Sequence, residues 1–215
     1  MTRRGLLLFA ATFTAGMGIG FALVLIGSTL ATRRARAASQ EQGTGVRVRD
    51  GSTADLDAVA AIRVSSWKDT YRPLMGGQVV DGLLDIGDHR RDIGRILSES
   101  QALLLVAEDG NHALAGFALS HIGADGEPFL ESLHVQPGRR SHGIGAQLLQ
   151  QTAARWAARG HRSMSLHVVE SNLRAKRFYD RLGGREVGVV VDDWRGAQVA
   201  QAIYRWNDLA AVRDR

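Results

Sequence analysis

A glycine-containing turn between an expected strand and an expected helix constrains the fold of this chain more than any other feature. The turn reads Arg140-Ser141-His142-Gly143-Ile144-Gly145, and it follows the apolar segment 129–135. Apolar residues then recur at helical spacing as far as Ala157. Glycines at such a junction let the backbone approach an anion, and the unpaired N–H groups at a helix start bind phosphate. The sequence therefore predicts an α/β domain with an anion-binding turn, the alternative being a turn that serves chain geometry alone. It is not a dinucleotide fingerprint, because the third glycine position is Leu148.

The remaining pattern completes one mixed α/β domain without internal repeats. Alternation and apolar runs predict strands at residues 46–49, 103–107, 113–120, 129–135, 163–169, 186–191 and 199–206. Ser52 followed by Asp55 is a capping signature for a helix that runs toward Trp67, with Pro73 ending it or the loop after it. Further helices are expected over residues 79–97 with breaks near Gly87 and Gly94, over residues 144–157, and from Asn172 to Gly183.

Charge and cysteine content exclude several classes of protein. The net charge is +5, but five arginines and one glutamate precede Val46, so the rest of the chain carries only +1. A nucleic-acid-binding domain needs a basic face, so we expect no nucleic-acid partner. The chain has no cysteine, which excludes disulfides, thiolate metal sites and cysteine nucleophiles. The scattered histidines His121, His142 and His161 do not form a metal motif, and no metal is expected.

The first 45 residues are organised around a long apolar segment. Residues 5–31 contain no charged residue over 27 positions, and about 20 residues suffice to span a bilayer. The first interpretation is a single transmembrane helix that anchors a cytoplasmic C-terminal domain, which agrees with three arginines after the segment and two before it. The second is a mis-assigned start, with a cytoplasmic protein beginning near Val46. The third is a cleaved export signal, suggested by Arg3-Arg4 and by the small-x-small Ala35-Arg36-Ala37. Residues 38–45 read as a linker.

Two motifs at matching spacing resemble the GNAT superfamily of N-acetyltransferases, in particular the small bacterial members. The turn at residues 140–145 resembles the family's R-x-x-G-x-G pyrophosphate motif, and residues 133–137 look like the strand leading into it. Residues 166–179, followed by Leu182-Gly183, resemble the second family signature. The resemblance covers residues 46–209, with residues 1–45 as hydrophobic segment and linker and residues 210–215 as a tail. It implies an α/β GNAT fold with a mixed, mostly antiparallel sheet flanked by helices, preceded here by a transmembrane helix.

The resemblance also implies acetyl-CoA as co-substrate, lying between strands 129–135 and 163–169. Backbone groups of Leu133 and Val135 would contact the pantetheine arm and the acetyl carbonyl. Asn172 would hydrogen-bond the pantetheine, a plain helix cap being the alternative. The pyrophosphate would be held by backbone N–H groups of Arg140, Ser141, His142, Gly143, Ile144, Gly145 and Ala146.

Tyr179 matches the family's usual general acid, which protonates the departing thiolate; packing in the core is its alternative role. The general base is less determined. An alkyl amine is about one part in a thousand unprotonated at pH 7. Many relatives have a glutamate where this chain has His167, whose imidazole suits the task. Glu131 is the second candidate, and a water relay is the third.

Trp67, Tyr71 and the run Asp192-Asp193-Trp194 match positions that line the acceptor site. Two carboxylates beside aromatic rings suit a cationic amine, a solvated loop being the alternative. The expected reaction is direct attack by a primary amine on acetyl-CoA in a ternary complex, with a small-molecule acceptor. Transfer to a protein N-terminus or lysine is one alternative. A CoA-binding sensor or interaction module without turnover is an alternative of another class, and a homodimer stays open as the assembly.

Overall fold

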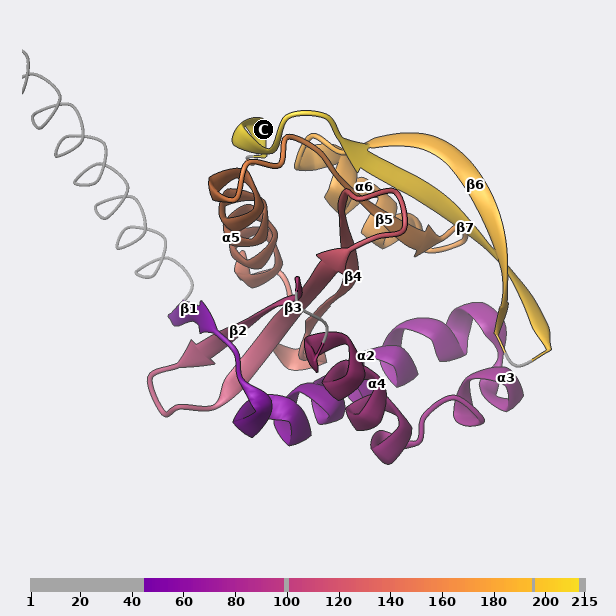
Figure 1. The fold of residues 1–215 in the computed structure, drawn as a ribbon. Helices are drawn as coiled ribbons and strands as arrows, with labels where there is room; N and C mark the ends of the chain where they lie inside the picture. Colours follow the sequence, from indigo (N-terminus) through magenta and orange to yellow (C-terminus); the bar gives the residue numbers. More distant parts are fainter. Residues whose placement is uncertain (1–44, 99–100, 195, 213–215) are drawn as a thin grey trace, which may run out of the picture. The chain divides into compact units, whose positions relative to one another are not determined.

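The computed structural model describes residues 45–98, 101–194 and 196–212, and it shows a seven-stranded sheet (Figure 1). The strands lie in the order β1-β2-β3-β4-β5-β7-β6, and every neighbouring pair is antiparallel except β4 and β5. The strands are β1 (Val46–Asp50), β2 (Leu103–Asp109), β3 (Leu114–Ile122), β4 (Pro128–Val135), β5 (Met164–Val169), β6 (Arg185–Trp194) and β7 (Ala197–Trp206). The α-helices are α2 (Leu56–Met75), α3 (Gly77–Asp81), α4 (Ile86–Ser98), α5 (Ile144–Ala158) and α6 (Leu173–Arg181), and short 3-10 turns lie at Thr53–Asp55, Pro137–Arg139 and Leu209–Ala211. The predicted mixed, mostly antiparallel sheet is confirmed.

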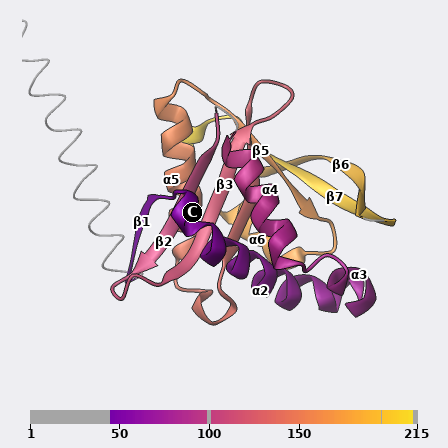
Figure 2. The same cartoon turned by 60° about the horizontal axis from the view of Figure 1, so that its bottom comes forward.

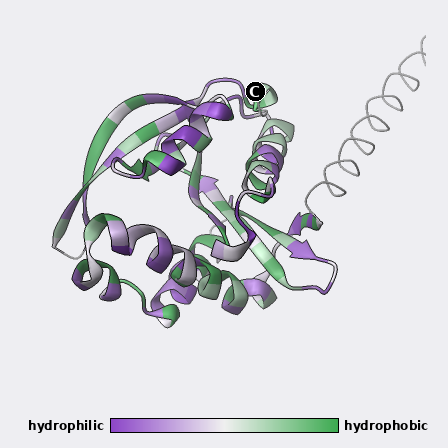
Figure 3. Cartoon of the chain, turned by 180° about the vertical axis from the view of Figure 1, so that it is seen from behind, coloured by the Kyte–Doolittle hydropathy of each residue, from purple (hydrophilic) through white to green (hydrophobic). Residues whose placement is uncertain are grey.

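Helices cover both faces of the sheet and create two apolar cores. Helices α2 and α4 lie on one side of the central strands and α5 on the other (Figures 1 and 2). The α2–α4 core contains Val59, Ile93 and Phe117, all fully buried. The opposite core contains Leu148 and Trp156 of α5 together with residues of α6 and β7. Figure 3 shows hydrophobic and hydrophilic residues side by side on these helices, as amphipathic packing requires.

Strand β4 has two irregularities that shape the functional site. It pairs with β5 only at Phe129 and Ser165, so the two parallel strands separate beyond that point. It also contains a β-bulge, because Ser120 of β3 pairs with Leu130 while Leu119 pairs with Ser132. Bulges leave one residue unpaired and re-aim its side chain. The unpaired residue here is Glu131.

The first two helical segments differ from the prediction. Helix α2 continues past Pro73 to Met75, since a proline in the last turn removes a single backbone hydrogen bond. The break expected near Gly87 lies instead between Asp81 and Ile86. It falls there because the Asp85 carboxylate accepts the Asp88 N–H at 2.7 Å and so starts α4. Gly87 and Gly94 both lie inside α4.

The C-terminal end of the packed domain lies beyond the predicted boundary. Val212 is buried in the α5-side core, so the packed part of the chain continues past Leu209. The predicted transmembrane helix at residues 5–31 and the linker at residues 38–45 lie outside the described residues, apart from the last residue of the linker. Within the part of the chain that the structure describes, no helix combines the length and hydropathy needed to cross a bilayer.

Candidate active site

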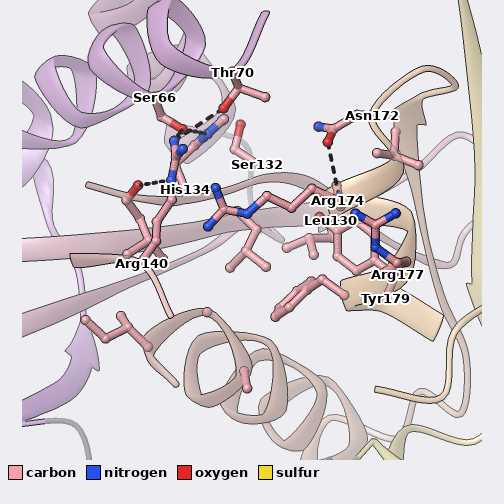
Figure 4. Close-up of a pocket in the computed structure, with 18 of the residues that line it drawn as sticks. Ser66, Thr70, Leu130, Ser132, His134, Arg140, Asn172, Arg174, Arg177 and Tyr179 are labelled. Atoms are coloured by element: carbon pink, nitrogen blue, oxygen red, sulfur yellow. Dashed lines mark hydrogen bonds between the residues drawn. The ribbon is translucent and has the colours of Figure 1, made fainter. Parts of the chain in front are cut away.

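The separation of β4 from β5 opens a pocket of about 730 Å³ that runs from the glycine turn to helix α2. Its walls come from α2, β4, the turn before α5, the end of β5 and α6. Figure 4 shows Ser66, Thr70, His134 and Arg140 on one side, with Asn172 and the α6 residues on the other. A parallel strand pair that splays apart exposes backbone N–H and C=O groups of both strands, and these can bind an extended ligand. Leu133 and Val135 line the pocket, as predicted for residues that contact a pantetheine arm.

The glycine turn has the geometry of an anion-binding nest. Ser141 and Gly143 both have left-handed backbone conformations, with φ of 66° and 79°. Alternation of left-handed with ordinary residues points successive N–H groups toward one centre. Gly143 is followed directly by the 15-residue helix α5, whose first N–H groups have no intrahelical acceptor. Non-glycine residues seldom adopt positive φ, and such strain is concentrated at functional sites.

Six of the seven residues predicted to surround the pyrophosphate line this pocket. His142 is not among the pocket-lining residues, and its ring Nδ1 lies 2.7 Å from the Arg140 carbonyl oxygen. The Arg140 side chain does not point into the nest. Its guanidinium forms an ion pair with Asp69 of α2 and donates to Ser66 Oγ at 3.1 Å and Thr70 Oγ1 at 3.3 Å. Arg140 therefore connects the glycine turn to helix α2.

Helix α6 contributes a basic wall that the sequence analysis left without a role. Arg174 and Arg177 line the pocket, and neither is paired with a carboxylate among the described residues. They are three residues apart and so lie on one side of the helix. Arg174-Ala175-Lys176-Arg177 is visible in the sequence, but a helix rich in arginine is also typical of a solvated surface. Asn172 lines the pocket and caps α6, because its Oδ1 accepts the Ala175 N–H at 3.1 Å.

Tyr179 reaches the pocket from an otherwise apolar environment. The residue is 9% exposed, and its ring packs 5.7 Å from Tyr204 and 5.9 Å from Trp206. Burial raises the pKa of the Tyr179 phenol well above its usual range, and nearby Tyr71 adds to the effect. The phenol therefore stays protonated at physiological pH and can donate a hydrogen bond into the pocket. The position of Tyr179 supports both interpretations made from the sequence, because its ring packs in the apolar core and the residue also lines the pocket.

The two candidate bases come from the two separated strands. Glu131 lies 3.7 Å from Arg63 and 3.8 Å from His121, each measured between nitrogen and carboxylate oxygen. The neighbouring His121 ring lowers the pKa of Glu131 against the opposing effect of burial, and the charge of Arg63 lowers it further. His167 also lines the pocket, and its ring lies edge-to-face with Phe129 at 5.0 Å. Glu131 is thus an ionised carboxylate, well suited to hold a cation.

The three aromatic residues predicted for the acceptor site, Trp67, Tyr71 and Trp194, lie together. Trp67 stacks on Trp194 at 5.1 Å, and Tyr71 lies edge-to-face with both rings. Tyr71 lines the pocket, and burial raises its pKa to about 12. Asp193 does not join this cluster. Its carboxylate accepts from Gly196 N at 2.7 Å and Gln198 Nε2 at 2.8 Å, which closes the β6–β7 turn.

Comparison with known proteins agrees with this geometry. The model of the acetyltransferase (GNAT) family matches residues 64–184, which is more than half of the chain, and the chain therefore belongs to this family. By that membership it is an acetyl-CoA-dependent N-acetyltransferase, with acetyl-CoA as co-substrate. It is 25% identical over 174 residues to the uncharacterized N-acetyltransferase YuaI of Bacillus subtilis, covering 78% of this chain and 96% of the relative.

Solved structures show the same fold. PaiA N-acetyltransferase from Thermoplasma acidophilum, solved in complex with coenzyme A, is similar with a TM-score of 0.57 and 23% identity over 73% of this chain and 97% of its own. A GCN5-related N-acetyltransferase from Rhodopseudomonas palustris has a TM-score of 0.64 at 18% identity, covering 75% of this chain and 95% of its own.

The residues of the pocket fit acetyl-CoA on their own chemistry. A nest of N–H groups together with Arg174 and Arg177 suits the phosphates of CoA. The separated edges of β4 and β5 suit an extended amide-containing arm. Acetyl-CoA supplies the activated acetyl thioester, and the chain supplies binding groups and proton donors and acceptors.

Proposed function

We propose that this enzyme transfers the acetyl group to the primary amine of a small molecule by direct attack in a ternary complex. One observation carries the proposal: a single pocket joins the anion-binding turn to Glu131 and to Tyr179. The groups needed to bind CoA, to attract an ammonium and to assist a leaving thiolate therefore line one cavity. The absence of cysteine from the chain leaves no route through a cysteine acyl-enzyme.

The pocket residues divide the proton chemistry between its two sides. Glu131, ionised beside Arg63, attracts the cationic amine and receives its proton directly or through water. His167 from β5 is the second group that can take this role. The Tyr179 phenol donates a hydrogen bond to the sulfur on which charge develops, and burial strengthens such a bond.

A small-molecule acceptor is favoured over a protein amine by the aromatic cluster around Tyr71, which is the member of the cluster that lines the pocket. Trp67, Tyr71 and Trp194 form a continuous aromatic cluster between α2 and the tip of the β6–β7 hairpin. A cluster that bridges two elements narrows the approach to the site, whereas a protein chain requires an open groove. Transfer to a protein N-terminus or lysine is the second candidate, because a protein chain has less access to the site than a small molecule.

We further propose that residues 5–31 anchor the enzyme to a membrane, with the acetyltransferase domain in the cytoplasm, where acetyl-CoA is made. The support is the sequence: 27 residues without a charge, flanked by arginines on both sides. Membrane fractionation of cells expressing the chain with a C-terminal tag tests this proposal. Recovery of the full-length chain in the soluble fraction, at its full mass, would refute it.

The catalytic proposal is tested by thiol release from acetyl-CoA across a panel of amines, using the purified full-length chain. The diagnostic pair is Tyr179→Phe and Tyr204→Phe. Both remove one phenol from the same aromatic cluster, but the Tyr204 hydroxyl bonds to Asp180 at 3.0 Å and does not line the pocket. We expect Tyr179→Phe to lower kcat by about a hundredfold, as for loss of a proton donor, and Tyr204→Phe to leave it within about threefold.

Acetyl-CoA binding, measured by calorimetry on the same variants, separates catalysis from folding. Both variants are expected to bind acetyl-CoA like the unmodified chain. Binding without thiol release on any amine would instead favour the sensor or interaction module.

A further inference from the structure

The pocket wall formed by α2 and β4 carries hydrogen-bond donors that acetyl transfer does not require. Ser66 and Thr70 are one turn apart on α2, and His134 lies opposite them on β4 (Figure 4). All three residues line the pocket. Each takes part in a short hydrogen-bond chain that starts at Arg140, and the direction of these bonds determines what the wall can bind.

Arg140 can only donate, which determines the direction of its own bonds to this wall. Its Nη2 donates to Ser66 Oγ and to Thr70 Oγ1. The Ser66 oxygen lies 3.0 Å from His134 Nδ1, so the Ser66 hydroxyl can donate its own hydrogen to that nitrogen while it accepts from Arg140. In this arrangement the ring proton of His134 is on Nε2. Thr70 likewise retains a hydroxyl hydrogen, for which the described residues provide no acceptor.

His134 stays a neutral N–H donor over the whole working range of pH. Burial lowers its pKa to about 3, and the guanidinium groups of Arg63 and Arg140 and the nearby His89 contribute to the same shift. The groups packed around it come from α2 (Arg63, Ser66), α4 (His89), β3 (Phe117) and the turn before α5 (Arg140). None of them is a carboxylate, so an anionic oxygen at His134 would meet donors and positive charge only.

Arg63 adds to this excess of donors. Its side chain is buried, and its Nε and Nη1 atoms have no hydrogen-bond partner in the described structure. Its closest carboxylate is Glu131 at 3.7 Å, beyond normal hydrogen-bond length. Arg63 does not itself line the pocket, but its positive charge lies behind the α2–β4 wall, which combines the donors of Ser66, Thr70 and His134 with the ionised acceptor Glu131.

We infer that the amine acceptor is a zwitterion, a small amino acid-like molecule with a carboxylate close to its amino group. The carboxylate would accept hydrogen bonds from His134 Nε2 and the Thr70 hydroxyl, while Glu131 faces the ammonium. This inference rests on the proposed function and specifies its substrate class. A polyamine would bring only N–H donors to this wall and leave the donors of the protein unpaired, which is unfavourable in a buried site.

The test compares matched acceptors on the full-length chain. The common α-amino acids and small amino dicarboxylates are screened first by thiol release from acetyl-CoA. The best substrate is then compared with its amide and with the amine that lacks the carboxyl group. We expect kcat/KM to fall in that order, by about tenfold or more between the acid and the decarboxylated amine, since a hydrogen bond to a charged group is lost.

Three variants and one control show whether His134 and Ser66 cause this preference. His134→Phe should remove most of it by lowering kcat/KM for the acid while changing that for the amine by less than about twofold. His134→Gln keeps an N–H donor and should retain part of it. Ser66→Ala should weaken it, and Ser65→Ala, an exposed neighbour on the same helix, should leave it unchanged.

The outcomes separate this inference from the proposed function. If acetyl-CoA binds and carboxylate-free amines are the better substrates, or no carboxylate-bearing amine is acetylated, the inference is wrong and the acetyltransferase remains. Equal losses for acid and amine in His134→Phe would also refute it, since the residue would then serve structure alone. Failure of the folded chain to bind acetyl-CoA would refute both.

Discussion

The left-handed conformation of Gly143 gives the sharpest test of the anion-binding turn. Replacing it with alanine adds a Cβ to a residue at φ of 79°, which costs roughly 1–2 kcal/mol for an L-residue. The lower entropy of the unfolded alanine chain offsets part of this, about 0.4–1 kcal/mol. If the turn keeps its shape, we expect the melting temperature to fall by a few degrees.

If the turn relaxes instead, the N–H groups move away from the phosphate position. One charge-assisted hydrogen bond contributes about 1.5–3 kcal/mol, so the Kd for acetyl-CoA should rise by about tenfold or more. Calorimetric titration of acetyl-CoA into the purified full-length variant measures this, and thermal unfolding of the same sample measures the strain.

Gly138→Ala is the matched control for Gly143→Ala. Gly138 lies five residues earlier, and a Cβ there would meet no atom within 4 Å. Its φ is not in the left-handed region. We expect an unchanged melting temperature and a Kd for acetyl-CoA that changes by less than about twofold. Wild-type affinity in a folded Gly143→Ala would refute the assignment of the turn to phosphate binding.

Three further predictions concern stability, the basic helix and the aromatic cluster. Asp55→Asn should lower the free energy of unfolding by about 1–2 kcal/mol at pH 7, because Asp55 pairs with Arg49 at 2.8 Å and belongs to the capping box of the 3-10 turn before α2. Since that pairing lowers the pKa of Asp55, the difference should shrink as pH falls below about 4, which acid unfolding curves would show. The Arg174→Ala and Arg177→Ala double variant should weaken acetyl-CoA binding several-fold at low salt and less at high salt, as titrations at two ionic strengths would reveal. Trp194→Ala should raise the KM for the amine by about tenfold while leaving the Kd for acetyl-CoA unchanged.

The elements that the sequence predicted well are those with local causes. Ser52 and Asp55 form the predicted capping box, and Asn172 caps α6, because a cap depends only on residues within one turn. The glycine turn was equally readable, since the conformation of Gly143 and the start of the helix are encoded side by side. These features place the cofactor half of the site.

The acceptor half of the site depends on features that the alternation of side chains along a strand cannot reveal. Strict alternation would place Glu131 on the same face of β4 as Leu133 and Val135. The bulge opposite Leu119 and Ser120 interrupts this alternation, so Glu131 lies near Arg63 of α2 instead. A bulge arises from the pairing of two strands and has no signature in one of them.

Asp193 and its neighbour Trp194 were both predicted for the acceptor site, and the geometry of the strand separates them. Adjacent residues of a strand point to opposite faces, and the face of β6 that meets α2 carries Trp194. Asp193 is exposed and bonds within the hairpin turn. Its predicted role in acceptor binding stays untested, and the geometry favours Trp194 for it.

Arg140 links the two halves of the site, and this gives the last prediction. Its backbone N–H was predicted to hold the pyrophosphate, and its side chain bonds to Asp69, Ser66 and Thr70 of α2. The fork of the guanidinium makes these contacts at once, whereas a lysine offers one compact charge without that geometry. Arg140→Lys should therefore retain the backbone nest and loosen the α2 wall.

We expect Arg140→Lys to change the Kd for acetyl-CoA by less than about threefold and to raise the KM for the amine by about tenfold. Steady-state kinetics with the amine varied, beside calorimetry with acetyl-CoA, separates the two effects. The opposite pattern, with weak cofactor binding and an unchanged KM for the amine, would mean that the side chain turns toward the phosphates when the cofactor binds. In that case the hydrogen bonds from Arg140 toward His134 would exist only without bound cofactor. The position of the acceptor wall would then depend on α2 and not on the glycine turn.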